Sequence, residues 1–178
     1  WNGINITPPL SGTFDFSQIP VFFTDNINLY YGSSHVKNGT GAIGGSVNLF
    51  TDTDWNRGVN GRVLAEYGSY NTYTVGGQAN ISGNKSASKT RLYYQHSDND
   101  YTYLNKVLTN IPFREKRQDA AYSQFGIMQE GYFRVSPYTR LTAVAWYQKN
   151  HRNLPQPLGV VNRSQEDQEE NNFRGYAG

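Results

Sequence analysis

The sequence contains no cysteine among its 178 residues, which excludes a disulfide scaffold and a thiolate metal site. It also lacks an excess of charge of either sign. Its 16 basic and 14 acidic residues give a formal net charge of +2, so a nucleic-acid-binding surface is not expected. The three histidines, His35, His96 and His151, have neither metal-ligand spacing nor a serine or cysteine partner. We therefore do not expect an enzyme.

Long hydrophobic runs are absent as well. No stretch approaches the roughly 20 apolar residues that a membrane helix needs. This does not exclude a membrane protein, because the strands of a membrane β-barrel alternate polar with apolar residues. A mean hydropathy of -0.70 with 14 tyrosines is compatible with such a barrel. The same totals fit a soluble all-β domain with a tyrosine-rich surface.

Glycine is abundant between residues 30 and 50. Residues 39–44 spell G-x-G-x-x-G, the fingerprint of dinucleotide-binding proteins. That motif requires a helix directly after it, whereas Ser46–Phe50 alternates in the manner of a strand. We therefore interpret these glycines as a tight turn, in which a residue without a Cβ permits positive φ values.

Three segments resemble, in the same order, the end of the plug domain of TonB-dependent outer-membrane receptors. They are Asp15–Pro20, Ile27–Ser34 and Gly41–Leu49. The family patterns are D-x-S-x-x-P, a strand that ends in R-G-P-x-S, and Y-G-S-x-A-I-G-G-V-I-N-I. Tyr31 and Ser33 replace the family's Arg and Pro, so the chain is more similar to Bacteroidetes-type receptors. The residues that match the plug motif are Asp15, Pro20, Gly32, Gly41, Gly44, Gly45 and Asn48.

The resemblance implies a division into two parts. Residues 1–54 would be the C-terminal part of the plug, and residues 55–178 the first strands, about six, of the barrel. A barrel of about 22 strands with about 9–11 residues per strand exceeds this chain, so we expect a fragment. The expected fold class is all-β, with a minor α/β plug remnant followed by antiparallel hairpins of a transmembrane β-barrel.

The alternation of apolar and polar residues along the sequence predicts where the strands begin and end. In the strands expected at 57–67 and 72–81, small and apolar residues share one face and polar residues the other. Further strands are predicted near 90–96, 121–134, 139–149 and 173–176, with short connections at 82–89 and 135–138. Long loops are predicted at 98–118 and 150–171, and Glu166–Glu170 is interpreted as a solvated acidic loop. Nearer the N-terminus we predict a turn that leads into a short strand within residues 1–6, a strand at 25–30, and a helical turn capped by Asp15 or Ser17.

The resemblance also implies a function, a ligand-gated importer in the outer membrane of a Gram-negative bacterium. The plug would block the barrel, and extracellular loops would capture a scarce nutrient such as cobalamin or an iron-siderophore. The TonB–ExbB–ExbD complex would move the plug through a Ton box that is absent from this chain. Outer-membrane lipid would surround the barrel, and the loop near 154–161 could contact the ligand or a surface lipoprotein. The lumen-facing residues Arg62, Glu66, Arg91 and Gln95 are expected to hydrogen-bond the plug.

Two further hypotheses remain open on the sequence. Asp98 and Asp100 are candidate calcium ligands, because carboxylate oxygens suit this ion and some vitamin B12 receptors of the family bind calcium in early loops. The rival to the receptor is a secreted or surface β-sandwich carbohydrate-binding module, whose tyrosines would stack on sugars. A sandwich core should carry large aliphatic side chains, whereas the predicted apolar face is mostly Gly, Ala, Val and Tyr.

Overall fold

The computed structural model describes residues 1–7, 15–32, 45–107, 111–158 and 165–178. The protein is all-β, and its strands form antiparallel sheets. The chain divides into two compact units, an N-terminal unit, Trp1–Asp54, and a C-terminal unit, Trp55–Gly178. The boundary falls within the polar, turn-rich segment 51–58. Across the described part of the chain, no helix is long and apolar enough to span a membrane.

The N-terminal unit contains two short 3-10 helices and one hairpin. Helix η1, Phe16–Gln18, begins after Asp15, whose carboxylate accepts a hydrogen bond from Ser17 N at 3.0 Å. This contact confirms the predicted cap, because it satisfies a backbone donor that the helix leaves unpaired. Helix η2, Val21–Phe23, follows Pro20. Strand β1, Asn26–Tyr31, then pairs antiparallel with β2, Gly45–Phe50, which confirms both predicted strands.

A turn at the N-terminus and a close contact between β1 and β2 shape this unit. The turn predicted within residues 1–6 is confirmed, because Asn2 and Gly3 adopt positive φ values of 48° and 86° and Ile4 N donates to Trp1 O at 2.8 Å. The short strand predicted after it is wrong, because residues 4–6 are not paired as a strand. The first residues therefore form a turn. Gly45 opens β2 at φ 149°, and a Cβ built there would lie 2.6 Å from Tyr30 O. The close approach of β1 therefore requires glycine at this position.

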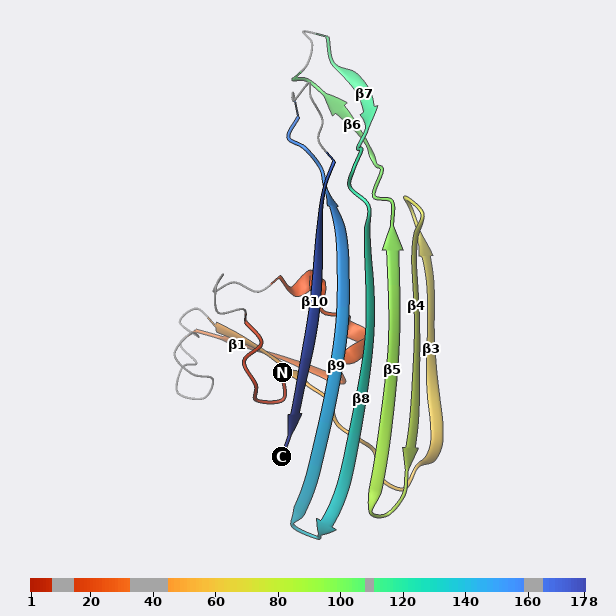
Figure 1. Cartoon of the computed structure of the whole chain (residues 1–178), viewed down its shortest axis with the longest axis vertical. Helices are drawn as coiled ribbons and strands as arrows, with labels where there is room; N and C mark the ends of the chain where they lie inside the picture. Colours follow the sequence, from red (N-terminus) through yellow and green to blue (C-terminus); the bar gives the residue numbers. More distant parts are fainter. Residues whose placement is uncertain (8–14, 33–44, 108–110, 159–164) are drawn as a thin grey trace. The chain divides into compact units, whose positions relative to one another are not determined.

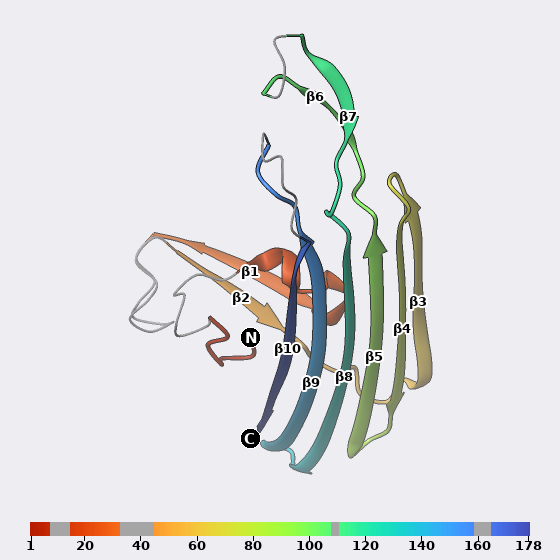
Figure 2. The same ribbon diagram turned by 45° about the horizontal axis from the view of Figure 1, so that its top comes forward.

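The C-terminal unit is organised by one six-stranded sheet with the order β10-β9-β8-β5-β4-β3. Neighbouring strands are antiparallel throughout, and in Figure 2 they curve together as a single layer. The strands are β3 Gly58–Gly68, β4 Thr72–Ser82, β5 Ser86–Ser97, β8 Tyr122–Ser136, β9 Thr139–Leu154 and β10 Glu166–Ala177. A separate hairpin joins β6, Thr102–Asn105, to β7, Phe113–Lys116 (Figure 1).

Several predicted boundaries are wrong, because pairing with neighbouring strands lengthens β5, β9 and β10, and because one predicted loop contains a hairpin of its own. Strand β5 begins at Ser86, so the predicted turn at 82–89 shortens to residues 83–85. The predicted loop 98–118 contains the β6–β7 hairpin. Strand β9 continues to Leu154 and β10 begins at Glu166, which shortens the second predicted loop. The acidic segment Glu166–Glu170 is therefore strand, paired with residues 150–154 of β9.

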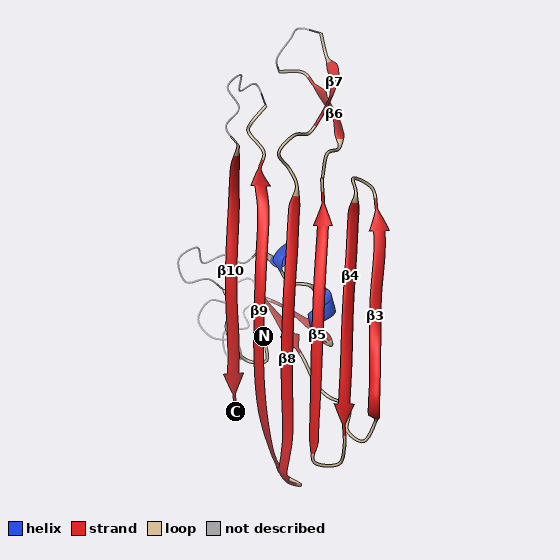
Figure 3. Ribbon diagram, turned by 45° about the vertical axis from the view of Figure 1, so that its right-hand side comes forward, coloured by secondary structure: helices blue, strands red, loops and turns tan. Residues whose placement is uncertain are grey.

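The connections differ between the two ends of the six-stranded sheet. At one end the connections are 83–85 and 137–138. At the other end they are 69–71, 98–121 and 155–165, and Figure 3 shows the β6–β7 hairpin beyond this same end. Residues Tyr70 and Asn71 both have positive φ, 60° and 51°, which closes the tight β3–β4 turn. We call the end with residues 69–71, 98–121 and 155–165 the long-loop end.

The two faces of the sheet have opposite character. Register places these residues on a face that we call the polar face: Asn60, Arg62, Glu66, Thr74, Gln78, Asn80, Lys89, Arg91, Gln95, Gln124, Met128, Glu130, Tyr132, Trp146, Gln148, Asn150, Asn172 and Arg174. The opposite, apolar face carries Val59, Val63, Tyr67, Val75, Ile81, Leu92, Phe125, Ile127, Phe133, Leu141, Tyr147 and Phe173. Val63 is 84% exposed and Phe173 74%, whereas Arg91 and Glu130 are fully buried. This is the reverse of the usual distribution in a water-soluble domain.

Candidate functional site

A row of long side chains crosses the middle of the polar face. In register from β3 to β10 it comprises Arg62, Gln78, Arg91, Met128, Trp146 and Arg174, and we call it the central row. The Gln78 side-chain oxygen accepts hydrogen bonds from Arg62 Nη2 at 3.3 Å and from Arg91 Nε at 3.1 Å. One amide therefore joins two guanidinium groups across three strands.

An ion pair lies beside this row. Arg91 Nη1 is 3.3 Å from Glu130 Oε2, and both side chains are fully buried. The other carboxylate oxygen, Oε1, accepts a hydrogen bond from the Tyr132 hydroxyl at 2.9 Å. Lys89 lies opposite Glu130 in the β5–β8 register. The carboxylate thus contacts side chains from its own strand, β8, and from β5.

Aromatic rings contact two further arginines of the C-terminal unit, Arg174 at the β10 end of the central row and Arg140 on β9 outside it. The Arg174 guanidinium lies 4.8 Å from the centre of the Trp146 ring, and Arg140 lies 5.5 Å from the Tyr132 ring. Such contacts attract a cation to the negative face of the ring without neutralising its charge. The polar face therefore presents cations that aromatic side chains hold in place.

The four predicted lumen residues, Arg62, Glu66, Arg91 and Gln95, all lie on the polar face. Arg62 and Arg91 meet through Gln78, whereas Glu66 and Gln95 lie two rows away on the same face, on either side of Thr74 in register. Their contacts with a plug stay a prediction. Sequence reasoning missed Glu130, Trp146 and Arg174. Alternation within β8 could have placed Glu130 on one face, but its pairing with Arg91 depends on the β5–β8 register.

The plug-motif residues that the structure describes lie in the N-terminal unit, at helix caps, in a turn and in β2. Asp15 caps η1, and Pro20 O accepts a hydrogen bond from Phe23 N at 2.9 Å. Gly32 follows β1 with φ 80°, and Asn48 pairs with Asn28. Two motif glycines, Gly41 and Gly44, lie outside the described residues, as does the G-x-G-x-x-G segment 39–44.

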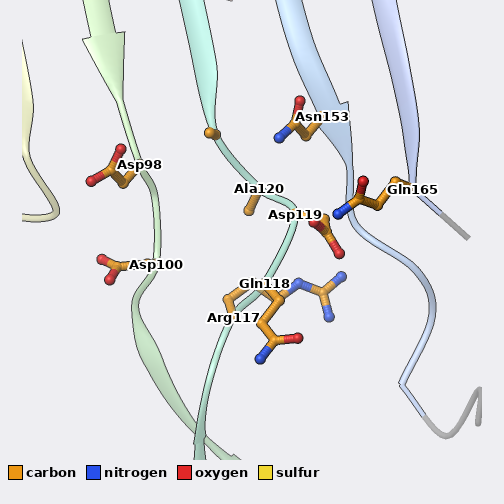
Figure 4. A pocket seen from close by; sticks show the side chains of 9 residues that line it. Asp98, Asp100, Arg117, Gln118, Asp119, Ala120, Asn153 and Gln165 are labelled. Carbon is orange, nitrogen blue, oxygen red and sulfur yellow. The ribbon is translucent and has the colours of Figure 1, made fainter. Parts of the chain in front are cut away.

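An open hollow of about 530 Å³ lies at the long-loop end. Figure 4 shows its side chains on the strand ends and connections of β5, β8, β9 and β10. The backbone is tied there, because Asn153 N donates to Ala121 O at 2.8 Å and Arg117 Nη2 donates to Gln156 O at 3.0 Å. The lining residues are Asp98, Asp100, Arg117, Gln118, Asp119, Ala120, Ala121, Asn153 and Gln165.

The two predicted calcium ligands lie in this hollow but face different bases. Asp98 Oδ1 is 3.1 Å from His96 Nε2, and Asp100 Oδ2 is 2.7 Å from Lys116 Nζ. The hydrogen bond from Lys116 holds the pKa of the Asp100 carboxyl below its usual value. Within the described ranges no group of three or more His, Cys, Asp or Glu could hold a metal ion. The calcium site stays a prediction.

Comparison with known proteins gives no further guide to function. No protein-family model matches the chain, and no curated protein is similar to it. The fold and site define an all-β protein whose six-stranded antiparallel sheet has one charged face and one exposed apolar face.

Proposed function

We propose that this chain is the end of the plug and the first barrel strands of a TonB-dependent receptor. Such a receptor imports a scarce nutrient across the outer membrane of a Gram-negative bacterium. The observation that carries the proposal is the contrast between the two faces of the six-stranded sheet. A membrane barrel turns apolar side chains outward to lipid and polar side chains inward to its lumen.

The apolar face supports a lipid-facing role. Each of the six strands contributes at least one exposed large hydrophobic residue to it. A contiguous apolar surface of this extent marks an interaction site, since single surface hydrophobics are normally scattered. Polar groups on this face pair with one another: Thr90 Oγ1 donates to Gln129 Oε1 at 2.6 Å, and the Tyr147 hydroxyl donates to Asn171 Oδ1 at 3.0 Å. Such pairing lowers the cost of placing them in lipid.

The polar face supports a lumen role. Its buried charged groups include Arg91 and Glu130, which are paired with each other, as charged groups away from bulk water must be. The strands contain 11 residues in β3 and up to 16 in β9. A tilted membrane strand needs about 9–11 residues, so each is long enough to cross.

The asymmetry of the connections gives a third line of support. Outer-membrane barrels have short turns on the periplasmic side and longer loops on the extracellular side. In this proposal the turns 83–85 and 137–138 face the periplasm, and the long-loop end faces the outside of the cell.

The N-terminal unit would then be the plug, as its motif residues suggest. In the proposed mechanism Arg62, Glu66, Arg91 and Gln95 hydrogen-bond the plug from the barrel wall. The TonB–ExbB–ExbD complex uses the inner-membrane proton gradient to move the plug after the outer loops have captured a ligand.

The rival, a β-sandwich carbohydrate-binding module, has weaker support. A sandwich buries the apolar faces of two sheets against each other. In the described part of the C-terminal unit, the sheet besides the six-stranded one is the two-stranded β6–β7 hairpin. It offers too little surface to cover twelve apolar side chains drawn from six strands.

Fractionation of the source cells tests the proposal. An antibody to this chain should detect, in the outer membrane, a band several times larger than 20.1 kDa. The band should migrate differently with and without boiling, because folded barrels resist detergent until they are heated. A soluble band near 20.1 kDa with no heat shift would overturn the proposal and favour the sandwich.

A further inference from the structure

We infer that the end of the six-stranded sheet opposite the long-loop end binds the headgroup of an anionic phospholipid. We call it the short-turn end, because residues 83–85 and 137–138 connect its strands (Figure 3). This inference rests on the proposed function in one respect, that the apolar face of the sheet contacts lipid. In the proposed orientation the phospholipid belongs to the leaflet that borders the periplasm.

The charges at the short-turn end have one sign. In the C-terminal unit this end comprises residues 55–58, 82–88 and 131–142, which contain four basic residues and no Asp or Glu. The nearest acid along these strands, Glu130, already pairs with Arg91. The four basic residues, which we call the basic cluster, are Arg57, Lys85, Arg134 and Arg140.

Contacts between neighbouring strands bring the members of the basic cluster to one edge of the sheet. Arg57 N, directly before β3, donates to Ser82 Oγ at the end of β4 at 3.1 Å. Arg134 N donates to Lys85 O at 2.7 Å. Arg134 also lies directly opposite Arg140 in the β8–β9 register. The basic cluster therefore extends from β3 through the β4–β5 turn to the β8–β9 hairpin.

The two arginines of the β8–β9 hairpin favour an anion between them. Like charges directly opposite in an antiparallel pair destabilise the sheet, and this is the relation of Arg134 to Arg140. The Arg134 side chain contacts neutral groups, because Nη1 donates to Asn84 O at 3.5 Å and the guanidinium lies 4.3 Å from the centre of the Trp55 ring. These contacts orient the cation without neutralising it. A phosphate group would relieve the repulsion, and its oxygens match the paired donors of a guanidinium.

Apolar side chains next to the basic cluster favour a lipid over a soluble anion. Phe133 and Leu141 lie opposite each other on the apolar face, and they are 50% and 53% exposed. Each is the sequence neighbour of an arginine, Phe133 of Arg134 and Leu141 of Arg140. Tyr138, in the turn itself, is 97% exposed, and tyrosine is enriched at membrane–water interfaces. Acyl chains on the apolar face would therefore bring a headgroup to the turn, where long arginine side chains can reach it.

The test compares the affinities of phosphatidylglycerol and phosphatidylcholine, with the same acyl chains, for the full-length protein in detergent. Native mass spectrometry during a lipid titration measures both affinities. We expect phosphatidylglycerol to bind more tightly, because the choline cation is repelled by the basic cluster. Arg134→Gln with Arg140→Gln should lower this preference about 25-fold, since each cation near an anionic surface contributes a factor of about five. Higher ionic strength should also weaken the preference.

The matched control is Lys106→Gln with Arg114→Gln, which removes two exposed cations from the β6–β7 hairpin beyond the long-loop end. It should leave the preference for phosphatidylglycerol unchanged. Lys85→Gln is a second variant that keeps both arginines, and its side chain is exposed in the β4–β5 turn. It should lower the preference about fivefold.

Equal affinity for the two lipids would overturn this inference, as would a preference that these variants leave intact or that the control lowers equally. Displacement of phosphatidylglycerol by equimolar inorganic phosphate would show that the occupant is a free anion. Displacement by polyglutamate would show that it is an acidic protein, and either result overturns the lipid assignment. Outer-membrane location and the heat shift, measured on the same preparation, test the proposed function separately. A folded barrel without a preference for phosphatidylglycerol contradicts only the lipid assignment.

Discussion

Arg91 and Glu130, 39 positions apart in the chain, form a fully buried ion pair, with 3.3 Å between Nη1 and Oε2. The pairing of β5 with β8 brings them together, since Arg91 lies opposite Met128, two residues from Glu130. Desolvation of two charges offsets much of their attraction, but removal of one partner leaves the other buried and uncompensated.

We therefore predict that Glu130→Ala lowers the free energy of unfolding by about 3–5 kcal/mol. Replacement of both partners, Arg91→Met with Glu130→Met, should cost less than the single change, because no unpaired charge remains. Urea titration of the detergent-folded protein, followed by the heat-shift gel, measures both. A double variant as unstable as the sum of its single variants would show that the two groups do not interact.

A charged substitution on the apolar face tests whether this face contacts lipid or water. Leu92 lies midway along β5 on this face, opposite Ile127, and is 46% exposed. In a lipid-facing position Leu92→Lys should cost about 2–4 kcal/mol. In water a surface substitution of this kind stays within about 0.5 kcal/mol.

Gln95→Lys is the matched control for Leu92→Lys, because it places the same cation on the same strand but on the polar face. It should be tolerated, since the lumen is polar. Folding yield in vesicles and the urea midpoint are the measurements. Equal, small effects of the two lysines would contradict a lipid-facing role for the apolar face.

Two glycines of the β3–β4 hairpin should respond differently to alanine. A Cβ at Gly61 would lie 2.9 Å from Gln78 O, whereas one at Gly77 meets no atom within 4 Å. Gly61→Ala must push the two backbones apart, and overpacking of this kind costs about 1–3 kcal/mol. Gly77→Ala should be neutral or stabilise slightly, because alanine loses less conformational entropy on folding. Thermal unfolding of the two variants compares them, and a more stable Gly61→Ala would show that the contact is absent.

The Asp100–Lys116 pair should depend on pH in a defined direction. The hydrogen bond between them lowers the pKa of Asp100 and raises that of Lys116. The contribution of Asp100 to stability is therefore present above the usual carboxyl pKa of about 3.9 and is lost as pH falls through the lower folded value. The contribution of Lys116 is present below about 10.4 and is lost as pH rises through the higher folded value.

A carboxyl NMR titration of the protein and of Lys116→Met measures this coupling. The Asp100 titration should move to higher pH in the variant, because the ammonium no longer stabilises the carboxylate. Asp52, in the N-terminal unit, serves as the internal reference. An unchanged Asp100 titration would contradict the contact.

The sequence by itself determined the strands whose alternation is strong. In β3 and β4 it separated Val63 and Ile81 from Arg62 and Gln78, because side chains of a strand alternate between its faces. It also determined local contacts such as the Asp15 cap of η1, which depends on residues two positions apart. These features require no knowledge of any distant segment.

Only the tertiary structure decided which distant residues meet. Glu166–Glu170 looks like a solvated loop, yet it is strand, because its backbone pairs with residues 150–154 of β9. Across this pair Lys149 Nζ lies 2.9 Å from Glu169 Oε1, and His151 Nε2 lies 3.3 Å from Asp167 Oδ2. The central row and the hollow likewise combine side chains from several strands. The register between strands sets these contacts, and register follows from the pairing of whole strands rather than from any one local pattern.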